Sequence, residues 1–135
     1  MSNENKATGL SLVTEARKWT GVPYVWGGND EKGWDCSGFV LFVLRKVGIN
    51  LPDMNANSIY SHCMKHNGSV TIDEAYRMPG VLLFRRESDS HRIVHVGFSD
   101  GDNNTIEARG KDYGTGVWHR RTGYTDAAKI PGVSY

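Results

Sequence analysis

The residue types best suited to chemistry in this sequence are a cysteine, a histidine and a glutamate that stand far apart along the chain. Cys36 follows an aspartate and opens an apolar segment with helical periodicity. A thiol in the first turn of a helix faces unpaired backbone N–H groups and the positive end of the helix dipole, which favours the thiolate. Those N–H groups can also stabilise a developing oxyanion. Cys36 is therefore a candidate nucleophile, with a small buried hydrophobe as the alternative. For its neighbours Asp35 and Ser37, the alternative role is that of helix caps.

A cysteine nucleophile needs a base, and His95 is the most suitable of the five histidines. It lies in the strand-like segment 93–98, on the same face as Gly97, which would leave room beside the imidazole. A hairpin at the polar turn 99–104 would bring Glu107 beside His95 or one residue away. A carboxylate that accepts from an imidazole N–H fixes the tautomer and stabilises the imidazolium. The alternatives are a core or surface histidine and an exposed strand glutamate.

Other potential ligands and thiols are expected to have ordinary roles. His62 and His66 are one helical turn apart, which without further ligands indicates a solvated helix face rather than a metal pair. Cys63 is interpreted as structural. Both cysteines are predicted to be free thiols, because a bond between them would abolish the chemistry of Cys36.

The elements that must position these residues are helices in the first half and strands in the second. Leu12, Ala16 and Trp19 share one helical face, with Ser11 as a candidate N-cap and Gly21 as a candidate stop. Further helices are predicted from Asp35 to a stop at Gly48 and over residues 55–66, and a short turn at residues 73–77. After the corner at Pro79 and Gly80, strands are predicted at residues 81–84, 93–98, 105–108, 113–119 and 123–133.

This order predicts an α+β domain with an antiparallel sheet. Residues 1–9 are predicted to form a flexible N-terminal arm, and residues 10–135 a single domain. The chain has 135 residues, 39% of them apolar, and a net charge of +1. That balance argues against a nucleic-acid or membrane-surface binder, which would need a basic excess. The longest apolar run has six residues, so no membrane span is expected, and no signal peptide is visible.

Three strings resemble the NlpC-type cell-wall peptidases, a papain-like group of cysteine peptidases. They are Tyr-Val-Trp-Gly-Gly at residues 24–28, Asp-Cys-Ser-Gly-Phe at 35–39 and His-Val-Gly at 95–97. The resemblance covers about residues 10–130. It implies a papain-like fold in which the Cys-led central helix packs on a small antiparallel sheet.

The resemblance also implies roles for individual residues. Cys36 would attack a peptide carbonyl, His95 would act as its base, and Glu107 would occupy the third position. Tyr24 would line the cleft and assist the oxyanion or the substrate. Asp35 and Ser37 would contact the substrate peptide. No metal or cofactor would take part.

Two positions depart from the pattern of the family. The third position is commonly His, Asn, Gln or Asp, whereas this chain has Glu107, which the nearby Arg109 could neutralise. Relatives usually have Asp after the Pro-Gly corner, and this chain has Val81, which puts the local loop structure in doubt. Six arginines are candidate ligands for substrate carboxylates, with solvated surface charge expected for most: Arg85, Arg86, Arg92, Arg109, Arg120 and Arg121.

The resemblance implies a peptidoglycan stem or cross-link peptide as the substrate, cut at the bond between γ-D-glutamate and a diamino acid. One alternative is an amidase of the CHAP kind, which cuts between muramic acid and L-alanine. Another is a non-catalytic module of a phage tail or secretion assembly. Delivery to the wall is expected through a phage tail or a secretion apparatus, or as a domain of a larger protein.

Overall fold

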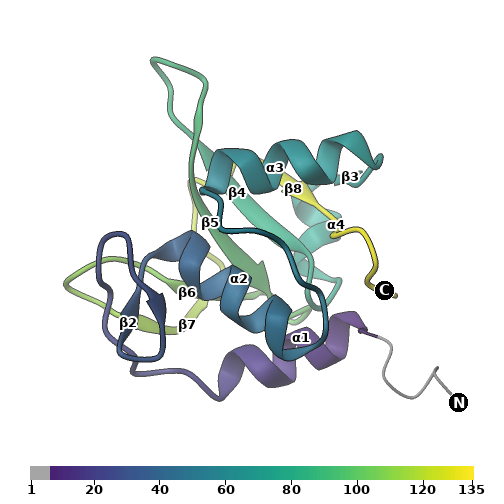
Figure 1. Ribbon diagram of the computed structural model, residues 1–135. Helices are drawn as coiled ribbons and strands as arrows, with labels where there is room; N and C mark the ends of the chain where they lie inside the picture. The colour runs from purple at the N-terminus through teal and green to yellow at the C-terminus, as the bar shows by residue number, and fades with distance from the viewer. Residues whose placement is uncertain (1–6) are drawn as a thin grey trace, which may run out of the picture.

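The computed structural model describes residues 7–135, which form four helices and eight short strands (Figure 1). The helices are α1 (Gly9–Arg17), α2 (Cys36–Lys46), α3 (Ala56–Lys65) and α4 (Ile72–Tyr76). The second and third helices lie where the periodicity predicts them. The turn expected near residues 73–77 is the short helix α4.

Two antiparallel sheets follow from the strand pairing. The smaller is a short hairpin that pairs β1 (Asn29–Asp30) with β2 (Gly33–Trp34). The larger has the order β3-β8-β4-β5-β6-β7. Its strands are β3 (Ser69–Val70), β4 (Leu82–Arg86), β5 (Ile93–Ser99), β6 (Asn104–Ala108), β7 (Thr115–His119) and β8 (Asp126–Ala128). The Pro79-Gly80 corner forms as expected, with Val81 buried before β4.

The start of α1 differs from the sequence prediction. Its N-cap is Thr8, not Ser11, because the two residues form a capping box: the Thr8 hydroxyl accepts from the Ser11 N–H and the Ser11 hydroxyl accepts from the Thr8 N–H. The helix ends at Arg17, before Gly21. Ala7, Thr8 and Gly9, assigned above to the flexible arm, are therefore part of the folded structure. Residues 1–6 of that arm lie outside the described residues.

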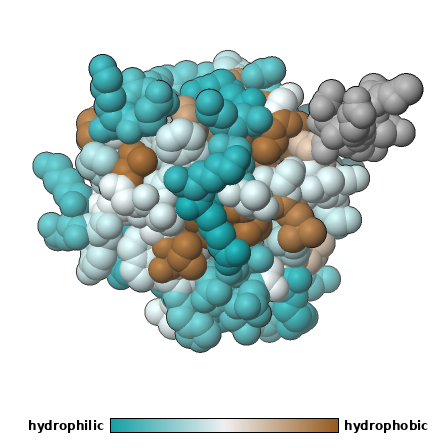
Figure 2. Space-filling model, turned by 90° about the horizontal axis from the view of Figure 1, so that it is seen from below, coloured by the Kyte–Doolittle hydropathy of each residue, from teal (hydrophilic) through white to brown (hydrophobic). Residues whose placement is uncertain are grey.

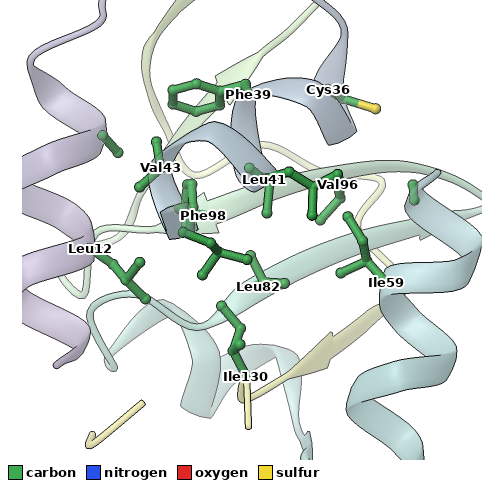
Figure 3. Close-up of a cluster of buried hydrophobic side chains, with 14 of the residues drawn as sticks. Leu12, Cys36, Phe39, Leu41, Val43, Ile59, Leu82, Val96, Phe98 and Ile130 are labelled. Carbon is green, nitrogen blue, oxygen red and sulfur yellow. The ribbon is translucent and has the colours of Figure 1, made fainter. Parts of the chain in front are cut away.

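The large sheet has a hydrophobic cluster on each of its two faces. Side chains alternate along a strand, so a single strand contributes to both clusters. Leu82 and Phe84 of β4 pack in the main core with the helices α1, α2 and α3. Leu83 points to the other face, where it joins Ala75 and Tyr76 of α4. Helix α2 is buried along residues 36–44 and lies at the centre of the main core (Figure 3). Its first residue, Cys36, is held at the edge of this core.

On the face seen in Figure 2, the apolar patches formed by residues 7–135 are small and lie among hydrophilic side chains. Among residues 7–135, no helix combines the length and the apolar character needed to cross a membrane.

Candidate active site

Cys36 is the first residue of α2, as the sequence predicts, and Asp35 is the N-cap. The Asp35 carboxylate accepts from the Gly38 N–H at 2.8 Å and from the Ser37 hydroxyl at 3.1 Å. These bonds fix the helix start and therefore the direction of the Cys36 side chain. Figure 3 shows the sulfur projecting from this end of α2, away from the apolar cluster.

The loop before α2 is locked against the helix by two glycines that approach each other closely. A Cβ on Gly38 would lie 2.2 Å from the carbonyl oxygen of Gly28, so only glycine fits there. The second carboxylate oxygen of Asp35 accepts from the Gly27 N–H at 3.1 Å. Asp35 thus joins the loop that carries Tyr24 to the helix that carries Cys36.

His95 and Glu107 are joined by a hydrogen bond between two neighbouring strands. The His95 Nε2 of β5 lies 2.8 Å from the Glu107 Oε1 of β6. The register differs from the prediction, since Glu107 lies beside Gly97 rather than beside His95 or one residue away. A Cβ on Gly97 would be 2.9 Å from the Glu107 Cβ. The bare backbone of Gly97 therefore gives Glu107 the room to reach His95 diagonally.

Glu107 is completely buried and is held by further donors. Its Oε1 accepts from the Tyr124 hydroxyl at 2.8 Å and from the Arg121 guanidinium. Its Oε2 accepts a short bond from the Thr105 hydroxyl. The alternative of an exposed strand glutamate is wrong, because this carboxylate lies inside the protein with both oxygens bonded.

The electrostatics favour an ionised His95–Glu107 pair. Burial by itself would lower the pKa of His95, but hydrogen bonds and charge interactions with Cys36 and Glu107 outweigh it and raise the pKa to about 9. Burial would likewise raise the pKa of Glu107, but the bonds from His95, Thr105 and Tyr124 lower it to about 2. The imidazolium is thereby stabilised next to the Cys36 side chain.

The thiol opens into a cleft of about 310 Å³. Its lining includes the six residues Tyr24, Trp26, Asp35, Ser37, Arg92 and Val94. Burial, followed by the negative charges of Cys36 and Asp35, raises the pKa of Tyr24 to about 12, so its hydroxyl remains a donor. Trp26 is 83% exposed at the cleft. The cleft therefore combines a protonated phenol, an exposed aromatic ring and a guanidinium around the thiol.

Asp35 and Ser37 both line the cleft. The alternative role as a helix cap is confirmed for Asp35 alone, because the Ser37 hydroxyl donates to Asp35 instead of accepting from the helix backbone. Both line a second hollow of about 190 Å³, together with Gly27, Gly28 and Asp53. Because the carboxylate of Asp35 accepts from backbone N–H groups of the loop and of α2, its main role is structural: it holds these two segments together.

The six candidate arginines lie in different environments. Arg92 lines the cleft, whereas Arg121 binds Glu107. Arg109 does not neutralise Glu107, contrary to the sequence interpretation. Its guanidinium lies 3.9 Å from the centre of the Tyr113 ring instead. The others lie at the surface: Arg86 pairs with Asp126, Arg120 pairs with Asp73, and Arg85 is exposed.

Thr105, Arg121 and Tyr124 are site residues that the sequence reasoning did not place around Glu107. Thr105 precedes Glu107 by two residues and so shares its strand face, which was a readable signal. Arg121 and Tyr124 come from the segment between β7 and β8, and no local pattern connects them with β6. The two cysteines are free thiols, as predicted, and Cys63 is fully buried on α3. Within residues 7–135, no group of three or more His, Cys, Asp or Glu side chains has the arrangement of a metal site.

A helix that begins at a cysteine, packed on an antiparallel sheet that carries a buried histidine and its polar partner, defines the papain-like fold. The family follows from the sequence. The model of the NlpC/P60 family matches residues 21–128, and the chain belongs to that family.

Named relatives agree with this assignment. The chain is 32% identical over 108 residues to a probable endopeptidase p60 of Listeria grayi, covering 80% of this chain and 19% of that protein. It is 35% identical over 94 residues to the bifunctional muramidase/DL-endopeptidase CwlT of Bacillus subtilis, covering 68% of this chain and 26% of that protein. The chain thus spans about a fifth to a quarter of the length of these relatives.

Among solved structures, the NlpC/p60 domain of the peptidoglycan hydrolase SagA superposes with a TM-score of 0.73 at 28% identity. The superposition covers 92% of this chain and 100% of that one. The predicted fold class is confirmed.

Proposed function

We propose that this domain is a cysteine peptidase that hydrolyses a peptide bond in peptidoglycan, with Cys36 as the nucleophile and His95 as the base. The observation that carries the proposal is the position of Cys36. It opens α2 at a cleft and interacts with a histidine that a buried carboxylate orients.

The geometry supports a two-step mechanism. The Cys36 thiolate attacks the peptide carbonyl carbon, and the carbonyl oxygen takes up the negative charge. The backbone N–H of Cys36 has no partner inside the helix. Together with the protonated Tyr24 hydroxyl it is a candidate donor to that oxyanion. The intermediate collapses as the C–N bond breaks and His95 gives its proton to the leaving amine, which leaves a thioester on Cys36.

Water then completes the cycle. His95, now neutral, takes a proton from a water molecule that attacks the thioester carbonyl. The C–S bond breaks, the peptide acid leaves, and the thiolate–imidazolium pair is restored. Glu107 keeps the imidazole oriented through both steps, because its bond to Nε2 leaves the other ring nitrogen for the cysteine and the substrate.

Two observations support peptidoglycan as the substrate: the names of the relatives in the family and the presence of an arginine at the cleft. The relatives are named endopeptidases and a peptidoglycan hydrolase. The Arg92 guanidinium at the cleft can donate two hydrogen bonds to one carboxylate. Stem peptides carry carboxylates along their length. The bond between γ-D-glutamate and the diamino acid is the specific site that we propose. A phage tail, a secretion apparatus or a longer protein is our proposed means of delivery.

The test is digestion of purified peptidoglycan, with the fragments identified by mass spectrometry. Wild type is compared with Cys36→Ala and with Cys63→Ala, a matched change at the buried cysteine away from the cleft. We expect fragments that end at γ-D-glutamate from wild type and Cys63→Ala, and none from Cys36→Ala.

Two other outcomes would redirect the proposal. Release of intact stem peptides from muramic acid would indicate the amidase. A folded wild-type protein that cleaves no wall type would favour a non-catalytic module.

A further inference from the structure

Glu107 is shared between two cationic side chains that bind the same oxygen atom. Its Oε1 accepts from His95 Nε2 and also from the Arg121 guanidinium. Arg121 enters from the segment between β7 and β8, and its side chain is 25% exposed, whereas Glu107 is fully buried. The imidazole and the guanidinium therefore stand two hydrogen bonds apart, with one carboxylate oxygen between them.

This arrangement affects how strongly His95 holds its proton. A buried carboxylate with no other counter-ion would stabilise the imidazolium through its full charge. His95 must give up that proton during the proposed reaction, so excessive stabilisation would slow the transfer. A second cation on the same oxygen repels the imidazolium and partly neutralises the carboxylate, so the imidazolium is stabilised less.

Resting on the proposed function, we infer that Arg121 is a positioning residue that sets the proton affinity of His95 through Glu107. With Arg121 present, the Glu107–Arg121 pair is neutral overall, and the cysteine–histidine pair is neutral overall whether it is ionised or not. The group that orients His95 is therefore the ion pair of Glu107 and Arg121, not Glu107 alone.

Other titratable and charged groups lie around the site and must stay constant in a test. They come from every element packed around the site: Tyr24 and Asp35 before α2, Cys36 in α2, Tyr76 in α4, Arg85 opposite His95 in β4, Glu107 in β6, and Arg121 and Tyr124 after β7. Among these groups other than Glu107 and Arg121, Cys36 has the largest effect on the pKa of His95, and replacing it by alanine removes that effect. The experiment is therefore done in a Cys36→Ala background.

The experiment follows the His95 imidazole by NMR as a function of pH in isotopically labelled protein. We expect Arg121→Gln to raise the pKa of His95 by about one unit, a tenfold change in its proton equilibrium. Arg121→Lys should return it toward the parent value, because the positive charge is restored. Arg120→Gln is the matched control, since this neighbouring arginine pairs with Asp73 and not with Glu107.

A second pair of variants tests the same coupling without relying on Arg121→Gln alone. Glu107→Gln leaves Arg121 facing His95 without the carboxylate, so the pKa of His95 should fall. Adding Arg121→Gln to Glu107→Gln should raise it again.

An unchanged or lowered pKa in Arg121→Gln, or a double variant equal to Glu107→Gln, would overturn the inference. A lowered pKa would show that Arg121 only holds the carboxylate in place. The NMR readout needs no substrate. Failure of this inference is thus distinct from failure of the proposed function, which is judged by Cys36-dependent cleavage in the wild-type protein.

In active protein the same coupling predicts a shift in the pH profile. The alkaline limb of kcat/KM should move to higher pH in Arg121→Gln and stay in place in Arg120→Gln.

Discussion

Gly97→Ala tests whether the position of Glu107 depends on the missing side chain in β5. The added methyl group would lie 2.9 Å from the Glu107 Cβ and 3.0 Å from the Tyr124 hydroxyl oxygen. The Glu107 Cβ is fixed to the backbone of β6 and cannot swing aside. Either the two strands separate, or Glu107 and Tyr124 shift together.

Two effects set the size of the change. Overpacking a closely packed interior costs about 1–3 kcal/mol. Replacing glycine also restricts the unfolded chain, which stabilises by roughly 0.4–1 kcal/mol. The free energy of unfolding should therefore fall by about 1–2 kcal/mol, or several degrees in Tm. A displacement of Glu107 on the order of 1 Å should lower kcat/KM about 10–100-fold through misorientation of His95.

The assay combines urea unfolding with kcat/KM on a stem-peptide substrate. Gly116→Ala is the matched control, because Gly116 lies opposite Glu107 in β7 and also lacks a positive φ. Its methyl group would meet the outer edge of the Trp118 ring at 3.0 Å, and this partly exposed ring can turn away. We expect the control to keep its stability and activity. Wild-type stability and turnover in Gly97→Ala would refute the reasoning, since Glu107 would then have no need of the space beside Gly97.

Three further predictions concern the thiols, the helix cap and the pH dependence. Iodoacetamide should label Cys36 near neutral pH and leave Cys63 unmodified, because burial raises the pKa of Cys63 to about 12; equal labelling of both in the native protein, read by peptide mapping, would contradict this. Asp35→Ala should lower the unfolding free energy by about 1–2 kcal/mol, since the Gly27 and Gly38 N–H groups lose their acceptor, and an unchanged urea midpoint would argue against the cap. Because the pKa of Glu107 is lowered from 4.5 to about 2, its ionisation stabilises the fold above pH 4.5 and this stabilisation disappears as the pH falls toward 2. The loss should reach up to about 3 kcal/mol and be absent in Glu107→Gln, as measured by unfolding at a series of pH values.

The local elements around the nucleophile could be predicted because short-range rules fix them. The start of α2 at Cys36 follows from the Asp35 cap and the apolar periodicity that comes after it. The error at α1 has the same local origin, since Thr8 and Ser11 form one capping box and either residue alone has the composition of an N-cap. The prediction chose the wrong member of that pair.

Residue contacts across the sheet were predicted less well. The sequence indicated that Glu107 would come near His95, but the register places it beside Gly97, and the side chain covers the remaining distance diagonally. A hairpin register depends on the turn and on the packing of both faces, so the residues of one strand do not determine it.

The sequence by itself determined which groups are available for chemistry: a thiol at a helix start, a strand histidine and a carboxylate two residues after a threonine. Only the tertiary structure decided which cation reaches that carboxylate. Arg109, close in sequence, stacks on Tyr113, whereas Arg121 arrives from a segment beyond β7. The physical reason is that helix starts and strand periodicity come from neighbours along the chain, whereas the partner of a buried charge is set by how distant segments pack around it.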